Sequence, residues 1–517
     1  MAFIDELQSI LEEDGNVAVT EKGAVGYRTT GKPLLDLHFS VSSLRNLSEA
    51  QIAARFAKAF FQDKLLAVKW LFFVADVREG MGERRLLRAV LQYLAYTEPE
   101  IAKAILPFIP EYSRFDNLLP LLDTPLQTDV VALYKAQIDK DVADMQNGKP
   151  VSLCAKWLPS ATATSATTKR YAKLLIQGFG VTAKQYRKTL SALRAHLDVV
   201  EVKMSKKAWG EIDYEHVPSK ANLLYEDAFL RNDNARRAKY LLDLSKGEAK
   251  INASVLYPHD VLVKYTQSNC WTLQVAKTNP TLEALWKSLP DFVQGDDKTL
   301  CVCDGSGSMT IRIGKTNVAA MHVATALSIY FAERASGAFQ DKYITFSENP
   351  QLVDLSKGKT LHDKIGIALS HDEVANTNIE AVFDLILLTA VKNNMKQSEL
   401  PKNLLILSDM EFDQCATSTH YGEPNAWQYK KLFAELAERY AQYGYRLPRL
   451  VFWNICSRTG AIPIKENDLG VALVSGFSPT VMSMVLSGKL DPYDCLLEQL
   501  SKPRYDAVEN AVKPIVD

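Results

Sequence analysis

The sequence predicts two structural classes in one chain of 517 residues: an all-α region of HEAT-like helical repeats, followed by a doubly wound α/β domain. Up to about residue 290, apolar residues recur at intervals of three and four, and β-branched runs are few, which is typical of helices. Beyond residue 295, short apolar runs alternate with amphipathic ones, which favours strands alternating with helices. With 47% hydrophobic residues and a net charge of -1, the chain can bury a core. We therefore expect two domains, 1–294 and 295–517.

The first region predicts successive helices joined by short polar turns, as in helix-pair repeats, although no fixed sequence period is visible. The clearest helical segments are 53–61, 65–77, 83–94, 170–179 and 183–197.

The second region predicts a sheet of parallel strands covered by helices on both faces, because its strands are short and apolar throughout. The expected strands are 300–303, 343–347, 351–355, 403–409, 450–455 and 470–476, and the expected helices lie at about 316–336, 379–394 and 427–443.

The first of these strands is followed by the sequence Asp304-Gly-Ser306-Gly-Ser308-Met309. Ligands of open α/β sheets bind at the carboxyl ends of strands, where these side chains can direct three oxygens at one point. One carboxylate and two hydroxyls are hard donors that suit Mg²⁺ or another hard divalent cation. Such a shell leaves the cation undercharged, so that it would attract a carboxylate from an acidic protein partner.

Two later loops are expected at the same edge of the sheet. Thr377 precedes the helix at 379 and offers a further hydroxyl, and Asp409 closes the strand 403–409 and offers a second carboxylate, directly or through water. A single D-x-S-x-S can also be a turn with a helix cap, but its place after the first strand favours the metal interpretation.

The DGSGSM sequence, the Thr377 loop and Asp409 resemble the metal-ion-dependent adhesion site of von Willebrand factor type A domains, over about residues 298 to 517. The resemblance implies a metal-mediated binding module. An enzyme is not expected, because the sequence lacks a P-loop, has Ser306 where a haloacid-dehalogenase-type Asp-x-Asp needs its second acid, and has no G-x-S-x-G elbow around Ser306.

A basic segment lies in the helical region. Residues 156–207 contain 11 basic and two acidic residues, a net charge of +9, so the rest of the chain carries -10. Basic residues bind phosphates, and interleaved aromatic residues such as Tyr171 and Tyr186 can stack on unpaired bases. The alternative is a solvated basic face balanced by acidic helices. The candidate phosphate contacts are Lys156, Lys169, Arg170, Lys173, Arg187, Lys188 and Arg194.

Several motifs upstream of the α/β domain resemble the TROVE module of Ro autoantigen proteins and of a related uncharacterised family. They are DVREGMGERR, KWLPS (156–160), YEHVPSKA (214–221), YPHD (257–260) and YRKTLSALR (186–194). The resemblance implies a ring of helical repeats closed by a type A domain, and a ribonucleoprotein that binds small structured RNA and single-stranded RNA ends.

The sequence thus predicts a non-enzymatic RNA-binding scaffold with a Mg²⁺-dependent type A domain. The alternative is a metal-dependent protein-interaction or structural module that binds no RNA. No secretion signal or apolar run long enough to cross a membrane is present, so we expect a cytoplasmic protein with no membrane partner.

Overall fold

A computed structural model describes residues 15–21, 25–269, 272–293, 298–346, 349–371, 378–412, 432–464, 470–486 and 489–517. The chain divides into two compact units. The sheet unit comprises Met1–Leu47 and Leu256–Gln499, and the helical unit comprises Ser48–Val255 and Leu500–Asp517. The chain therefore passes from one unit to the other three times.

These units differ from the predicted limits of 1–294 and 295–517, because both ends of the chain pack away from their sequence neighbours. In the sheet unit, Ser42 Oγ donates to the carbonyl of Asn454, whose side chain donates to the carbonyl of Phe39. In the helical unit, Arg504 pairs with Asp76. Contacts between residues about 400 positions apart leave no trace in local periodicity, so the sequence pattern could not reveal them.

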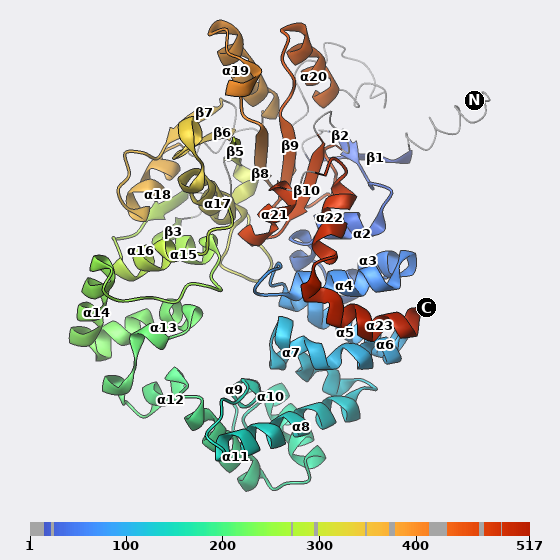
Figure 1. The fold of residues 1–517 in the computed structure, drawn as a ribbon, viewed down its shortest axis with the longest axis vertical. Helices are drawn as coiled ribbons and strands as arrows, with labels where there is room; N and C mark the ends of the chain where they lie inside the picture. Colours follow the sequence, from blue (N-terminus) through green and yellow to red (C-terminus); the bar gives the residue numbers. More distant parts are fainter. Residues whose placement is uncertain are drawn as a thin grey trace. The chain divides into compact units, whose positions relative to one another are not determined.

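The sheet unit is built on six strands in the order β10-β9-β8-β5-β6-β7 (Figure 1). The strands are β5 (Thr299–Asp304), β6 (Lys342–Phe346), β7 (Gln351–Asp354), β8 (Asn403–Ser408), β9 (Arg449–Asn454) and β10 (Val471–Ser475). β5 lies between β6 and β8 and is parallel to both. The predicted α/β layout and each expected strand are present.

The sheet is mixed and not wholly parallel, because β7 runs antiparallel to β6. Only four residues separate these two strands, too few for the helical crossover that a parallel neighbour requires. The remaining neighbours, β10 with β9 and β9 with β8, are parallel.

Apolar side chains on both faces of the sheet are covered, as continuous apolar strands predict. On β9, Trp453 packs against Phe331 of the helix Ala320–Arg334, and its neighbour Phe452 packs on the opposite face against Phe433 of the helix Leu432–Gln442. The helices of this unit are α2 (Pro33–Phe39), α15 (Pro258–Tyr265), α16 (Pro280–Lys287), α17 (Ala320–Arg334), α18 (Leu361–Leu369), α19 (Ile379–Lys392), α20 (Leu432–Gln442), α21 (Met482–Leu486) and α22 (Pro492–Leu500).

Two antiparallel hairpins complete the sheet unit: β1 (Val17–Val19) with β2 (Val25–Tyr27), and β3 (Thr266–Asn269) with β4 (Thr272–Val275). The first hairpin is joined to the segment after β9, since Tyr27 and Ile462 exchange backbone hydrogen bonds of 2.8 and 2.9 Å. Gly26 is required there, because a Cβ at this position would lie 2.4 Å from the carbonyl oxygen of Ile462.

Several helices that are neighbours in sequence pack together in the helical unit, as helix-pair repeats predict. The helices are α3 (Glu49–Gln62), α4 (Lys64–Ala75), α5 (Arg84–Thr97), α6 (Pro99–Ile105), α7 (Ile109–Tyr112), α8 (Gln127–Gln146), α9 (Cys154–Trp157), α10 (Ala166–Gly178), α11 (Ala183–His196), α12 (Val200–Ser205), α13 (Ser219–Asn232), α14 (Asn234–Lys246) and α23 (Asp506–Val516). Helix α4 is buried from Ala67 to Ala75, a stretch that is apolar apart from Lys69, so it forms the centre of the first repeats.

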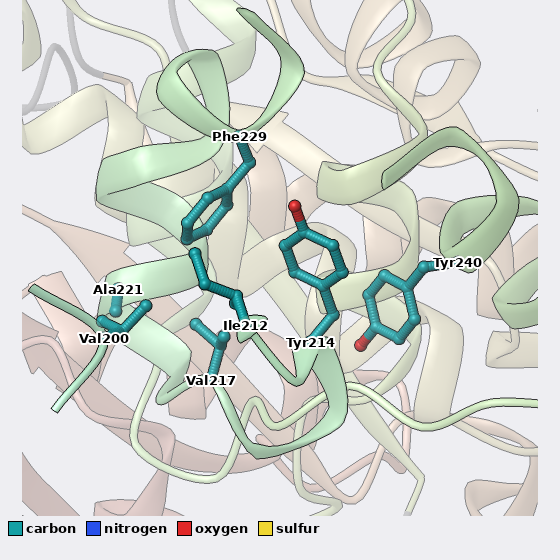
Figure 2. Close-up of a cluster of buried hydrophobic side chains, with 7 residues drawn as sticks. All are labelled: Val200, Ile212, Tyr214, Val217, Ala221, Phe229 and Tyr240. Atoms are coloured by element: carbon teal, nitrogen blue, oxygen red, sulfur yellow. The ribbon is translucent and has the colours of Figure 1, made fainter. Parts of the chain in front are cut away.

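A second core lies where α12, α13 and α14 meet. Figure 2 shows Tyr214, Tyr240 and Phe229 grouped within it. The rings of Tyr214 and Tyr240 stack at 5.4 Å, and the buried guanidinium of Arg237 lies 4.9 Å from the Tyr214 ring. The apolar pattern of these helices is therefore completed by a cation–π contact.

The C-terminal helix α23 is anchored to the helical unit by buried charge. Asp76, at the end of α4, is fully buried and accepts hydrogen bonds from Arg504 and from the backbone N–H of Arg78. Lys69 of α4, 5% exposed, pairs with Glu509 of α23. Among the described residues, no helix is long and apolar enough to cross a lipid bilayer.

Replacing Asp76 by Ala should destabilise the protein by about 3–5 kcal/mol, because it leaves the Arg504 guanidinium without its buried carboxylate. The measurement is a urea-unfolding series on the full chain. The matched control is Asp139→Ala, whose carboxylate pairs with Lys135 on the exposed side of α8 and is worth about 0.3–0.5 kcal/mol. Equal midpoints for the two variants would contradict the anchoring role of Asp76.

Candidate metal centre and basic helical surface

The candidate metal centre lies at the carboxyl ends of β5 and β8, two adjacent parallel strands. β5 ends at Asp304 and β8 ends at Ser408, so Asp304 and Asp409 emerge at the same edge of the sheet. Each of these two carboxylates is 1% exposed. The structure thus brings together the two acids that the sequence places at separate strand ends.

The turn after β5 directs its polar groups inward. Asp304 Oδ1 accepts the backbone N–H of Ser306 at 2.9 Å, and the hydroxyls of Ser306 and Ser308 lie 3.0 Å apart. On the other side, Asp304 Oδ2 accepts the hydroxyl of Ser408 at 2.6 Å. These contacts fix the Asp304 carboxylate beside the two serine hydroxyls predicted to share its ligand.

Asp304 is electrostatically strained in this setting. Burial, followed by the nearby negative charge of Asp409, raises the pKa of Asp304 to about 7, and the hydrogen bonds from Ser408 and Ser306 offset only part of that effect. A buried pair of acids stabilises a cation more readily than it tolerates two negative charges.

Asp409 is followed by an unusual backbone turn. Met410 is fully buried with φ of 62°, in the left-handed region that residues with a side chain rarely adopt. Its N–H donates to Ser408 Oγ at 2.9 Å. Such a turn lets Asp409 and Glu411 both direct their carboxylates into the protein, and strained backbone of this kind is frequent at functional sites.

Arg458, in the loop after β9, contacts the candidate centre. Its Nη1 donates to Asp409 Oδ2 at 2.9 Å, and its Nε donates to Glu21 Oε2 at the same distance. The second oxygen of Asp409 accepts the backbone N–H of Glu411. One of the two buried acids therefore has a resident cationic partner.

Glu411 is the third buried acid of this region, with an exposed fraction of 0%. Its Oε1 accepts the backbone N–H groups of Arg458 and Thr459, and the Ser457 hydroxyl, at 2.7 to 3.2 Å. Its Oε2 accepts the backbone N–H of Glu21. Both carboxylate oxygens of Glu411 therefore accept hydrogen bonds from the protein, and Glu411 is not available as a metal ligand.

The donors present fit a hard divalent cation. Asp304, Ser306 and Ser308 offer oxygen ligands at one point, with Asp409 beside them, and hard oxygen donors of this kind suit Mg²⁺. Thr377, the fifth predicted ligand, lies outside the described residues. Within the described ranges, no group of three or more His, Cys, Asp or Glu side chains could hold a metal, so any ion here would depend on the serine hydroxyls.

Three residues of this centre were not predicted from the sequence: Ser408, Glu411 and Arg458. Ser408 directly precedes Asp409 at the end of the same strand, and this position could have indicated that it belongs to the centre. Glu411 and Arg458 carry no local signal, because their roles depend on contact between the ends of β8 and β9.

The basic surface consists of five exposed cations on α10 and α11, which both pack against α8 (Figure 1). They are Lys169 and Lys173 on α10, and Lys184, Arg187 and Lys188 on α11. Their spacings of three and four place the members of each set on one face of their helix. In the described part of the chain, no carboxylate pairs with any of the five. Lys184 was not among the predicted contacts.

The other three predicted phosphate contacts are engaged within the protein. Arg194 donates to the carbonyls of Ala155 and Leu158, at 2.8 Å each, and so fixes the turn after α9. Arg170 forms a two-pronged ion pair with Asp123, with both distances 2.6 Å. Lys156 Nζ lies 3.6 Å from Glu201.

The aromatic side chains near the basic surface are engaged as well. Tyr186 is 3% exposed and donates its hydroxyl to the carbonyl of Pro159. Tyr171 donates to Asp123, and Arg170 lies over its ring at 5.1 Å. Trp157 is covered by the Arg114 guanidinium at 3.8 Å. The surface therefore presents cations without accessible aromatic faces from these three residues.

Comparison with known proteins shows a relative that matches most of the chain. The uncharacterised protein L728 of Acanthamoeba polyphaga mimivirus is 30% identical to this chain, over 94% of this chain and 87% of that protein. The chain belongs to the same family as L728. Within it, residues 177–296 match a domain of unknown function, DUF2828, and residues 298–513 match another, DUF7788. The DUF7788 match spans the strands of the six-stranded sheet in this chain, and α11 of the basic surface falls in the DUF2828 match.

Among solved structures, the crystal structure of the Ro (RSR) protein of Deinococcus radiodurans is similar to this chain, with a TM-score of 0.40 and 15% identity. The similarity covers 85% of this chain and 91% of that one. A likeness this distant decides neither the fold of each unit nor the function.

Proposed function

We propose that the protein is a non-enzymatic RNA-binding scaffold that binds RNA phosphates through the basic surface and holds a divalent cation at the ends of β5 and β8. The observation that carries the RNA proposal is the absence of any acidic residue between Asp144 and Asp198, a stretch with nine basic residues. The five cations of the basic surface lie within it and are exposed. The resemblance of the sequence motifs to the TROVE module supports the same proposal.

The engaged aromatic residues favour recognition of phosphates over stacking on bases. With Tyr171, Tyr186 and Trp157 in internal contacts, affinity rests on the lysines and on Arg187, which attract phosphates and release counterions. Such binding tolerates many sequences and weakens steeply as salt rises. Small structured RNA and single-stranded RNA are both suitable ligands on this basis.

The double variant Lys169→Gln, Lys173→Gln should weaken RNA binding and lower the salt dependence of log K by about 2, roughly 1 for each phosphate contact removed. The measurement is filter binding of a small hairpin RNA and of an unstructured RNA over a salt series.

The matched control is Lys135→Gln, which removes one positive charge that already pairs with Asp139 on α8. Its affinity and salt slope should equal those of the wild type. No binding at low salt, or equal effects of the control and the double variant, would contradict the RNA proposal.

The metal proposal rests on the buried acids. Asp304, Ser306 and Ser308 would bind the ion, and Asp409 would add negative charge beside it. When bound, Mg²⁺ would supply positive charge and an open position for an anionic ligand. The resemblance of this turn to the adhesion site of type A domains points in the same direction.

Asp304→Asn should abolish stabilisation by Mg²⁺, because it removes the charged ligand at the centre of the donor set. For the wild type, Mg²⁺ at 100 times its Kd should add about 2.7 kcal/mol of stability, measured as a rise in Tm over the metal-free protein. The control is Asp384→Asn. Asp384 lies on α19 and pairs with Arg439 of α20, so this variant should keep the Mg²⁺ response. An equal response in Asp304→Asn and wild type would exclude this site.

A second candidate function is metal-dependent binding of an acidic protein partner. It is favoured by the pairing of Asp409 with Arg458, which leaves a bound divalent ion with surplus positive charge. In that case a carboxylate-bearing partner would bind only with the ion present, and the lysine variants would have no effect.

A further inference from the structure

Arg458 has a contact that its place in the sequence does not suggest. It is the only residue of its loop, among the described residues, whose side chain forms an ion pair with Asp409. Asp409 is 1% exposed, whereas the Arg458 side chain is 22% exposed and also reaches Glu21. The guanidinium therefore lies between the buried acid and the surface.

The loop that carries Arg458 is held independently of this ion pair. Glu411 accepts the backbone N–H groups of Arg458 and Thr459, and Ile462 pairs with Tyr27 of β2. Removing the guanidinium would therefore remove a charge without releasing the backbone. This separation makes the charge testable by substitution.

At the centre, the guanidinium of Arg458 and a bound divalent cation would compete for the carboxylate of Asp409. Asp304 and Asp409 are both buried, and among the described residues the positive charge that contacts the pair is that of Arg458. A divalent cation bound beside Asp304 would be drawn to the same Asp409 carboxylate and repelled by the guanidinium. In this interior the repulsion is screened less than at the surface.

We propose that Arg458 is an internal counter-ion that competes with the divalent cation for Asp409, stabilising the centre without the ion and lowering its affinity for the ion. The inference rests on the metal centre proposed above and assigns its regulation. Because Glu21 shares the guanidinium, the same reasoning makes Glu21 a modulator: it offsets part of the positive charge that Arg458 presents to the ion.

If Arg458 has a purely structural role, the affinity for the ion should change in the opposite direction when the guanidinium is removed. If the guanidinium served only to orient Asp409 as a ligand, its removal would disorder that carboxylate and weaken the binding of the ion. Competition instead requires that removal of the charge tightens binding. The direction of the change in affinity distinguishes the two.

The experiment is titration calorimetry of Mn²⁺ into the full-length chain, with melting of the metal-free protein measured in parallel. Arg458→Gln should bind Mn²⁺ about tenfold more tightly, as expected for loss of one like charge near the ion, and should melt lower without metal. Arg458→Lys keeps the charge and should retain the wild-type affinity. The control Arg439→Gln removes an arginine that pairs with two acids elsewhere in the sheet unit and should not alter affinity.

Glu21→Gln provides an independent variant at a half-exposed position, so that a folding failure of Arg458→Gln does not end the test. It should weaken Mn²⁺ binding, the reverse of Arg458→Gln. Unchanged or weaker binding by Arg458→Gln, or unchanged or tighter binding by Glu21→Gln, would overturn the competition while leaving the metal centre in place. Absence of binding in the wild type and in every variant would overturn the metal centre itself and the competition with it, whereas binding by Arg458→Gln alone would support both.

Discussion

The burial of two carboxylates at the ends of neighbouring parallel strands is the constraint on which the rest of the sheet unit's polar structure depends. Asp304 and Asp409 are both buried and repel each other, and burial and repulsion together raise the pKa of Asp304. Ser408, the N–H of Ser306 and Arg458 all direct positive or partially positive charge at the pair. The surrounding protein thus supports two acids that an apolar core alone would reject.

The same constraint explains why distant parts of the chain converge on one edge. Glu411 fixes the loop that carries Arg458, and the N-terminal segment contributes Glu21 and the backbone pairing of Tyr27. In the helical unit, Arg194 and Arg170 are bound to partners within the protein, whereas no carboxylate pairs with the five cations of the basic surface among the described residues. The proposed RNA contacts are therefore the residues that the fold itself does not use.

The local hydrophobic pattern was sufficient to predict helices and strands whose formation is determined by their own residues. Helix α11, expected at 183–197, spans Ala183–His196, and β8, expected at 403–409, spans Asn403–Ser408. Helix α18 was missed because its nine residues include Gly366 and are too short for a clear period. The direction of β7 was predicted wrongly, although the short link from β6 already excludes a parallel neighbour. The position of the N-terminal hairpin depends on contacts remote in sequence. For the same reason Asp304, Ser306, Ser308 and Asp409 could be proposed from strand order, whereas Arg458 could not.

We propose above that the buried acids at this edge form a cation site. Anomalous diffraction from a crystal of the full chain grown with Mn²⁺ tests it most directly. A cation site here should give one strong anomalous peak in contact with oxygens of Asp304, Ser306 and Ser308, with Asp409 beside it. A crystal grown with Mn²⁺ that shows no peak at these residues, and in which Asp304 Oδ2 still accepts the hydrogen bond of Ser408, would contradict the proposed cation site.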